Sequence, residues 1–172
     1  MMTRAKSSQF PKTTSFDAVV VSGRGEASSL VSEYRNEIFR VTGVDCVPGS
    51  LNLVFQSPVA LSTPTAIEFG RDRRLWQGTL NGVPVLVARW KRARQHICEI
   101  YSDQHLRSSL GLRDGDRVDL QLFVADLERV PLRARLTWML LWSLGRGRWF
   151  FSNNLYRSVT APVELILRSL QR

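Results

Sequence analysis

The sequence contains few of the residues that form disulfides or bind transition metals. Among its 172 residues are two cysteines, Cys46 and Cys98, and two histidines, His96 and His105. The cysteines fit no metal-ligand spacing and both lie in apolar stretches, so we expect buried free thiols in a reducing cytoplasm. Either histidine can assist proton transfer, but a structural role is the more common one for an isolated histidine.

The sequence also lacks a long apolar run. The longest, residues 136–144, is far shorter than the roughly 20 residues that span a bilayer. The basic, polar N-terminus has no apolar core of a secretory signal, and we expect residues 1–14 to be a disordered leader. These features predict a soluble, cytoplasmic protein with at most a peripheral membrane contact.

Acidic residues are outnumbered by basic ones. The chain has 15 Asp and Glu against 24 Lys and Arg, a formal net charge of +9. Such a surface attracts anions: nucleotides, phosphorylated compounds, nucleic acid or acidic lipid. The charge by itself does not choose among these partners.

Short apolar and β-branched segments, separated by turn residues, indicate a mainly β fold with helices. The expected strands cover residues 15–22, 50–55, 65–69, 74–79, 83–90, 96–101 and 118–124. The dipeptide Asn81-Gly82 predicts a tight hairpin, because both residues tolerate positive φ. Many short strands with one early helix favour a closed or nearly closed β-barrel over residues 15–127.

Two helices are expected within this barrel domain. Apolar residues at helical spacing predict a helix over residues 30–41, capped by Ser28 or Ser29 and ended by Gly43. A shorter helix is expected over residues 104–110.

The composition changes after the barrel. Residues 131–172 carry seven arginines against one acid, Glu164, and three of the five tryptophans. We expect a helix over residues 132–144, an irregular Gly-Arg-Gly-Arg link and a final helix over residues 161–170. Residues 128–172 are therefore predicted to form a basic, Trp-rich helical extension.

A glycine-rich segment follows the first expected strand and precedes the long helix. It reads Gly23-Arg24-Gly25-Glu26-Ala27-Ser28. Glycines let backbone N–H groups approach phosphate oxygens closely, and a helix N-terminus adds a favourable dipole. The pattern fits a phosphate-binding loop, although a tight turn is the commoner use of such a glycine pair.

A second segment, Pro48-Gly49-Ser50-Leu51-Asn52, marks a turn into a strand. Ser50 and Asn52 are two residues apart, so their side chains share one face of that strand. A hydroxyl and an amide oxygen suit Mg²⁺, which prefers oxygen ligands and completes its shell with phosphate and water. The simpler alternative is a strand whose polar residues face solvent.

A third segment begins at Glu99. It continues through Gln104-His105-Leu106-Arg107 to Leu110-Gly111-Leu112-Arg113-Asp114-Gly115-Asp116. The planar guanidinium of Arg107 can hold a phosphate or the edge of a base. Asp114 and Asp116 are expected to form a turn rather than to take part in catalysis.

Together, the three segments resemble the CTP-dependent riboflavin kinases. That family has a G-x-G-E loop after its first strand, a P-x-G-T-L-N strand, and a glutamate leading into an L-R-x-x-L-x-L-x-D-G-D segment. The corresponding segments here read GRGE, PGSLN and EIYSDQHLRSSLGLRDGD. The resemblance extends from about residue 16 to residue 124.

The resemblance implies a six-stranded cradle-loop barrel that transfers the γ-phosphate of CTP to riboflavin and forms FMN. It implies that the nucleotide is framed by two segments: Gly23, Arg24, Gly25, Glu26, Ala27 and Ser28, and then Gln104, His105, Leu106 and Arg107. Ser50 and Asn52 would bind Mg²⁺, and Glu99 would contact the acceptor. Glu26 and Asn52 are the candidate catalytic residues.

Two positions depart from the family pattern. Ser50 replaces a threonine and keeps the hydroxyl. Lys91 stands where the family has a threonine that contacts the flavin, and it belongs to the basic segment Trp90-Lys91-Arg92-Ala93-Arg94. A basic loop there would suit an anionic acceptor, so riboflavin and an anionic compound both remain candidates.

Two other functions are compatible with the sequence. A basic barrel with an Arg- and Trp-rich tail can bind nucleic acid through phosphate contacts and aromatic stacking. Alternatively, residues 132–149 can lie in a membrane surface as a basic amphipathic helix. A nucleotide-binding enzyme is distinguished from both by loops that converge on a pocket.

Overall fold

The computed structural model describes residues 11–23, 25–70 and 72–152, apart from the side chains of Glu26 and Ser152. The strands are β1 (Thr13–Val21), β2 (Leu51–Phe55), β3 (Ala60–Leu61), β4 (Ile67–Phe69), β5 (Arg73–Leu80), β6 (Val83–Trp90), β7 (Ile97–Tyr101), β8 (Arg117–Phe123) and β9 (Leu127–Glu128). The helices are α1 (Glu26–Thr42), α2 (Leu106–Ser109), α3 (Leu132–Thr137) and α4 (Trp149–Ser152).

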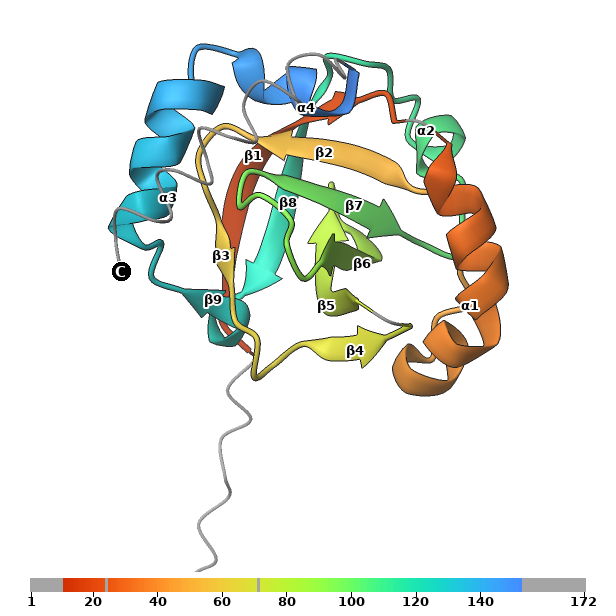
Figure 1. Ribbon diagram of the computed structural model, residues 1–172. Helices are drawn as coiled ribbons and strands as arrows, with labels where there is room; N and C mark the ends of the chain where they lie inside the picture. The colour runs from red at the N-terminus through yellow and green to blue at the C-terminus, as the bar shows by residue number, and fades with distance from the viewer. Residues whose placement is uncertain (1–10, 24, 71, 153–172) are drawn as a thin grey trace, which may run out of the picture.

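Six strands close into an antiparallel barrel (Figure 1). They follow the order β5-β6-β7-β2-β1-β8, and β8 pairs back with β5. The strand β4 extends the sheet beside β5, and β3 pairs with β9. The predicted mainly β fold with a six-stranded barrel is confirmed.

Alternating apolar residues fill the barrel. On β8, Val118, Leu120 and Leu122 are buried while the residues between them are not. They pack with Leu53 of β2 and Val87 of β6 in the largest apolar cluster. This period-two pattern is what fixes the register of each strand, because a slip by one residue would turn its apolar face to solvent.

The hairpin between β5 and β6 is also confirmed. Asn81 and Gly82 have φ of 48° and 84°, as a two-residue turn with positive φ at both positions requires. The side chain of Asn81 accepts a hydrogen bond from the backbone N–H of Asp119 at 2.9 Å. Cys46 and Cys98 are buried free thiols, as expected.

The predicted serine cap of the long helix is wrong. Helix α1 begins at Glu26 with Gly25 as its N-cap, in the left-handed conformation, so Ser28 and Ser29 lie inside the helix. The predicted end is confirmed, because Gly43 closes α1 with a hydrogen bond from its N–H to the carbonyl of Phe39 at 2.8 Å.

Helix α1 covers the outer face of the sheet near β4 and β7 (Figure 1). Its buried residues Val31 and Ile38 pack with Phe69, Leu75 and Tyr101. This packing fixes the position of the helix N-terminus beside the ends of β1 and β2.

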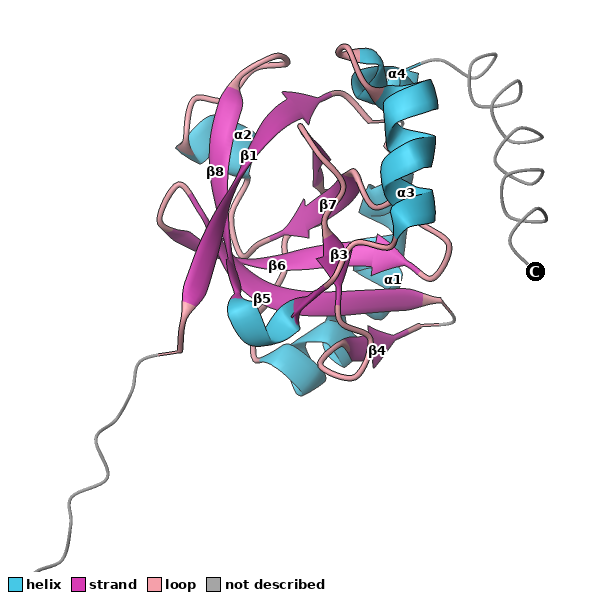
Figure 2. Ribbon diagram, turned by 90° about the vertical axis from the view of Figure 1, so that its left-hand side faces the viewer, coloured by secondary structure: helices cyan, strands magenta, loops and turns pink. Residues whose placement is uncertain are grey.

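The described part of the C-terminal extension, up to residue 152, packs against the barrel (Figure 2). Helix α3 continues as a π-helical turn over Trp138–Trp142, and a 3-10 turn over Arg146–Arg148 leads into α4. The expected continuous helix over residues 132–144 is therefore in part an α-helix and in part a π-helix. The expected final helix over residues 161–170 lies outside the described residues.

Two buried aromatic residues hold the extension in place. Trp142 and Phe150 are each 2% exposed and pack on Val21, Val54 and Ile97 of the barrel. At Gly147 the backbone comes so close to the barrel that a Cβ atom would lie 3.0 Å from Val54. The extension thus covers the outer face of β2 and β7 on the side away from α1.

Candidate nucleotide and acceptor site

Three neighbouring strands align the central residues of the site. Asn52 on β2 lies opposite Val21 on β1 and opposite Glu99 on β7. Directly opposed residues point to the same face of a sheet, so the amide and the carboxylate share the outer face of the barrel. Both are buried polar residues, 8% and 9% exposed. Charged and amide groups at this depth are usually there for a partner or a ligand.

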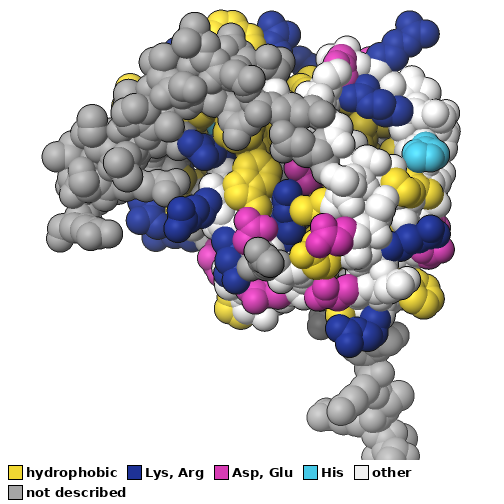
Figure 3. Space-filling model, turned by 45° about the vertical axis from the view of Figure 1, so that its right-hand side comes forward, with side chains coloured by type: hydrophobic (Ala, Val, Ile, Leu, Met, Phe, Trp, Pro, Cys, Tyr) yellow, Lys and Arg dark blue, Asp and Glu magenta, His cyan; other side chains and the backbone are white. Residues whose placement is uncertain are grey.

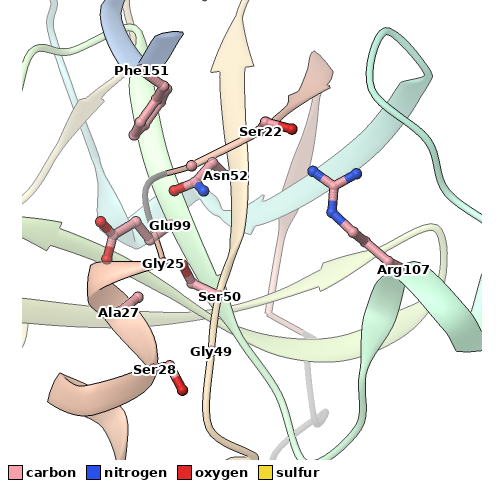
Figure 4. Close-up of a pocket in the computed structure, with 11 residues that line it drawn as sticks. Ser22, Gly25, Ala27, Ser28, Gly49, Ser50, Asn52, Glu99, Arg107 and Phe151 are labelled. Atoms are coloured by element: carbon pink, nitrogen blue, oxygen red, sulfur yellow. The ribbon is translucent and has the colours of Figure 1, made fainter. Parts of the chain in front are cut away.

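A pocket of about 280 Å³ opens over this face (Figure 4). We call it the first pocket. The glycine-rich loop and the start of α1 line it with Gly23, Gly25, Ala27 and Ser28. The strand side contributes Ser50, Asn52 and Glu99, and the remaining wall includes Arg107 and Phe151. The structure therefore brings together predicted residues from all three sequence segments.

The glycine-rich loop meets Asn52 directly. A Cβ atom on Gly23 would lie 2.0 Å from Nδ2 of Asn52, so only glycine allows this approach. Gly25, the N-cap of α1, has φ of 79°, a conformation that favours glycine, and it brings no side chain to the first turn of the helix. The first N–H groups of a helix lack partners within it. Together with the helix dipole, they make the loop and α1 a suitable site for phosphate oxygens.

Glu99 is held by two donors. Its Oε2 accepts hydrogen bonds from Arg73 Nη1 at 3.2 Å and from the hydroxyl of Tyr101 at 2.9 Å. Burial and the adjacent Glu99 raise the pKa of Tyr101, so its hydroxyl stays protonated and donating. Among the described residues, both hydrogen bonds go to Oε2. The other oxygen, Oε1, is left for a ligand in the first pocket.

A second pocket, also of about 280 Å³, adjoins the first. Gln104, His105, Leu106 and Ser108 line it from the side of α2. Gly49, Ser50 and Arg107 line both pockets and form the wall between them. A nucleotide can therefore extend from one pocket into the other across these residues.

Arg107 is held in this wall by an ion pair. Its Nη2 donates to the carbonyl of Val21 at 3.0 Å and to Oδ1 of Asp114 at 2.7 Å. The hydroxyl of Ser22 donates to the other oxygen of Asp114. This hydrogen bond and the one from Arg107 hold the pKa of Asp114 below its usual value. Asp114 forms a turn, as expected, but it also positions Arg107.

The polar oxygens of the first pocket fit a magnesium site. Ser50 and Asn52 line the pocket together, as their spacing predicts. The described residues contain no group of three or more His, Cys, Asp and Glu that could hold a metal on their own. A cation here would therefore be bound by the hydroxyl, the amide oxygen and oxygens of a bound phosphate, a donor set typical of Mg²⁺.

Some predicted residues are not placed in the pockets. Lys91 lies in the turn after β6, where its ammonium is 3.8 Å from Oε1 of Glu68. It is not among the residues that line either pocket. Arg24 lies outside the described residues, and so does the side chain of Glu26.

His96 is also away from the site. It is 2% exposed and lies under the extension, with its ring 4.9 Å from that of Trp142. Burial, together with the charges of Arg89 and Arg94, lowers the pKa of His96 to about 3. A structural role for His96, the commoner of the two roles weighed above, is what this burial supports.

The residues of the site that were not recognised in the sequence as such include Ser22, Arg73, Tyr101, Asp114 and Phe151. Tyr101 and Glu99 share a strand face, since they are two residues apart. This spacing could have identified Tyr101 as a neighbour of Glu99. Arg73 and Phe151 reach the site only through strand pairing and through packing of the extension.

The charges on the surface are mixed in sign. On the face shown in Figure 3, Lys and Arg side chains are interspersed with Asp and Glu. Exposed ion pairs such as Arg35–Asp45 and Arg74–Glu68 contribute to this mixture. In the described part of the chain, no helix is long and apolar enough to cross a membrane.

Comparisons with known proteins show which family the chain belongs to. The family model of CTP-dependent riboflavin kinases, described as "Domain of unknown function DUF120", matches residues 20–122. The chain is 27% identical to a riboflavin kinase of Saccharolobus solfataricus over 125 residues, covering 61% of this chain and 71% of that protein.

Two further relatives are riboflavin kinases of Methanocella arvoryzae and Thermococcus kodakarensis. Each is 33% identical, over 116 and 119 residues, and 60% of this chain is covered in both cases. The matches span 54% and 56% of those proteins, about half of their length. With its barrel, its glycine-rich loop and a family match over more than half of its residues, the chain belongs to the CTP-dependent riboflavin kinase family.

Proposed function

We propose that the protein transfers the γ-phosphate of CTP to a hydroxyl group of riboflavin and so forms FMN. One observation carries the proposal: a single pocket is lined by a glycine-rich loop at a helix N-terminus, by Ser50 and Asn52, and by the anchored carboxylate of Glu99. This arrangement offers a place for phosphate, for a cation and for an acceptor next to one another.

The donor occupies both pockets in this proposal. The triphosphate lies over the backbone N–H groups of the loop and the start of α1, and the cytidine extends past Arg107 toward Gln104 and His105. Membership of a family named for CTP supports the choice of donor. Hydrogen bonds from fixed backbone donors and a guanidinium offset the charge that develops on the phosphoryl group during transfer.

Mg²⁺ would be held by Ser50 and Asn52 and would supply neutralisation of phosphate charge. The chain's own residues do the rest of the work. The loop and α1 bind the phosphates, and Asn52 is kept in place by Gly23. Arg73 and Tyr101 orient Glu99, whose free oxygen can accept a hydrogen bond from the acceptor. Alignment of the acceptor hydroxyl with the γ-phosphate is the main catalytic contribution of such a site.

The acceptor side of the pocket suits an uncharged ring better than an anion. It contains the carboxylate of Glu99 and the ring of Phe151, and a carboxylate repels a negatively charged acceptor. The anionic alternative depended on Lys91, which does not line the pocket and lies near Glu68. Riboflavin, an uncharged planar compound with hydroxyl groups, therefore fits better.

The decisive experiment offers the purified protein each of the four nucleoside triphosphates with Mg²⁺ and riboflavin. We expect FMN, detected by mass spectrometry, with CTP and little with the other three. CTP should also raise the melting temperature more than ATP does, because a ligand that binds only the folded state stabilises it. ATP as the better donor, or CTP turnover without FMN, would contradict the proposal.

A further inference from the structure

The C-terminal extension places one aromatic side chain in the first pocket. Phe151 belongs to α4, which lies beyond the segment that matches the family, residues 20–122. It lines the pocket together with Asn52 and Glu99. In Figure 4 the ring of Phe151 points from α4 toward the space between these two residues. A residue outside the family domain thus reaches the proposed site of transfer.

The helix that carries Phe151 is held in place by aromatic packing. Its neighbour Phe150 is 2% exposed, stacks on Trp90 with ring centroids 6.1 Å apart, and meets Trp142 edge-on at 5.7 Å. Phe150 and Phe151 are themselves in edge-to-face contact at 5.3 Å. These contacts fix the backbone of α4, so the ring of Phe151 is held at the pocket and is only partly buried.

The same packing links the extension to Glu99. The guanidinium carbon of Arg73 lies over the ring of Trp90, 5.5 Å from its centroid. The same guanidinium donates a hydrogen bond to Glu99. The extension therefore supports the acceptor side of the pocket in two ways. It packs against Trp90, which contacts the residue that holds the carboxylate, and it supplies a partly buried ring to the pocket that this carboxylate lines.

Phe151 lies on the acceptor side of the site. It lines the first pocket and not the second, whereas Arg107 lines both. In the view of Figure 4, Phe151 and Arg107 lie on opposite sides of Asn52. An apolar ring adds little to a site for phosphates, but it packs well against a planar aromatic compound, for which offset or edge-to-face contacts are favourable.

We propose that Phe151 is an acceptor-binding residue, which packs against the planar ring of the acceptor and makes the C-terminal extension part of the substrate site. This inference rests on the proposed function, because it takes riboflavin as the acceptor. It adds a residue and a segment that the family match does not include.

The test measures riboflavin and CTP binding separately by calorimetry, with Mg²⁺ present, for the full-length protein and four variants. Phe151→Ala and Phe151→Leu remove the aromatic ring, and Phe151→Tyr keeps it. Trp149→Ala is the matched control, since Trp149 is an aromatic residue of the same helix, 39% exposed, that lines neither pocket. Phe151→Leu retains apolar bulk, so the test does not depend on whether the alanine variant folds.

We expect the Kd of riboflavin to rise about five- to tenfold in the Ala and Leu variants and to stay within about twofold in the Tyr and Trp149 variants. The Kd of CTP should stay within about twofold throughout. Unchanged riboflavin binding in Phe151→Leu would overturn the role of Phe151 and leave the proposed function standing. An equal loss of CTP and riboflavin binding would also overturn it. If the wild-type protein binds CTP but no riboflavin, the proposed acceptor and this role of Phe151 both fail.

Discussion

The backbone of Gly23 lies against the side-chain amide of Asn52. A Cβ atom at residue 23 would lie 2.0 Å from Nδ2 and 3.0 Å from Cγ of Asn52, well inside van der Waals contact. The glycine-rich loop and the proposed metal ligand are thus fitted to each other, although 29 positions separate them in the sequence, from 23 to 52. Each one restricts where the other can be.

Replacing Gly23 with alanine should therefore displace the amide of Asn52. We expect kcat/KM for CTP to fall by at least about tenfold, and the Mg²⁺ concentration needed for half-maximal rate to rise, because a misplaced ligand is costly in such sites. Steady-state kinetics at varied Mg²⁺ would measure both quantities.

The double variant Gly23→Ala/Asn52→Ala tests whether the two residues act together. Asn52→Ala should itself abolish most transfer, with the free energy of unfolding changed by no more than about 1–2 kcal/mol. Residues in contact have non-additive effects. Once the amide of Asn52 is removed, Gly23→Ala has nothing left to displace, so the double variant should be no less active than Asn52→Ala. Losses that simply add would mean that Gly23 acts independently of Asn52.

Much of the barrel could be predicted because its signals are local. The strand Val83–Trp90 has the predicted bounds, and the Asn81-Gly82 hairpin follows from the φ that these residues tolerate. The ends of the other predicted strands agree with the structure or differ by one or two residues, and the two-residue strands β3 and β9 were not predicted. Such short strands exist only through pairing with each other, which a local pattern does not indicate.

The start of α1 shows a limit of capping rules. Serines are common N-caps, yet the helix begins earlier, at Glu26, after a glycine in the left-handed conformation. A glycine N-cap brings no side chain to the first turn of the helix. The local rule thus fails at the loop that we propose to bind phosphate, and such exceptions are common at binding sites.

The part of the first pocket around Glu99 could not be fully predicted from the sequence, because it is formed by contacts between distant segments. Arg73 and Glu99 are on separate strands, with β6 lying between them in the sheet, and become neighbours only when the register is set. Phe151 reaches the first pocket because Trp142 and Phe150 are buried on the barrel. The motifs of the family resemblance predicted Ser50, Asn52, Glu99 and Arg107, all of which line the first pocket. They also predicted Lys91, which lines neither pocket, and they did not predict Phe151.

The double variant Lys91→Thr/Arg92→Ser tests this difference directly. Both side chains are exposed in the turn after β6, and Lys91 is near Glu68. We expect KM for riboflavin and for CTP to stay within about twofold of wild type, since exposed charges away from a site have small effects. A several-fold change in KM for the acceptor alone would show that this loop reaches the substrate.

Asp114→Asn should weaken nucleotide binding selectively. The substitution keeps the size of the side chain but removes the charge that pairs with Arg107 at 2.7 Å. Arg107 would then be less well held in the wall between the two pockets. We expect KM for CTP to rise severalfold, with KM for riboflavin little changed.

Asp116→Asn serves as the control for this change. The carboxylate of Asp116 accepts a hydrogen bond from the backbone N–H of Arg113, and Asp116 lines neither pocket. It should leave both KM values near wild type. Equal effects of the two substitutions would indicate a general disturbance of the turn rather than a loss of the Arg107 pair.

The last prediction concerns His96, which lies beneath the extension. Its side chain is 2% exposed, its Nε2 has no hydrogen-bond partner among the described residues, and its ring is 4.9 Å from that of Trp142. Burial is the main reason that its pKa falls from 6.5 to about 3, and the nearby Arg89 and Arg94 lower it further. His96 is therefore neutral in the folded protein at all but strongly acidic pH.

The unfolded chain binds a proton at His96 below pH 6.5, whereas the folded protein does so only near pH 3. Between these values the unfolded state holds more protons, so the stability that neutral His96 provides is complete above pH 6.5 and decreases as the pH falls. Each pH unit well inside the window costs about 1.4 kcal/mol. We expect this residue alone to lower the free energy of unfolding by about 1–2 kcal/mol between pH 6.5 and pH 5.

Urea unfolding at pH 7.5, 6.5, 5.5 and 5.0 would measure this contribution, with the two histidines compared. His96→Gln removes the titrating group, so the decrease from pH 7.5 to pH 5.0 should shrink by about 2 kcal/mol relative to wild type. His105→Gln is the control, because His105 is exposed on the loop before α2 and the wild-type decrease should persist. If His96→Gln and wild type lose stability in parallel, His96 is not the group that couples acid to unfolding, and its burial under Trp142 is looser than the structure describes.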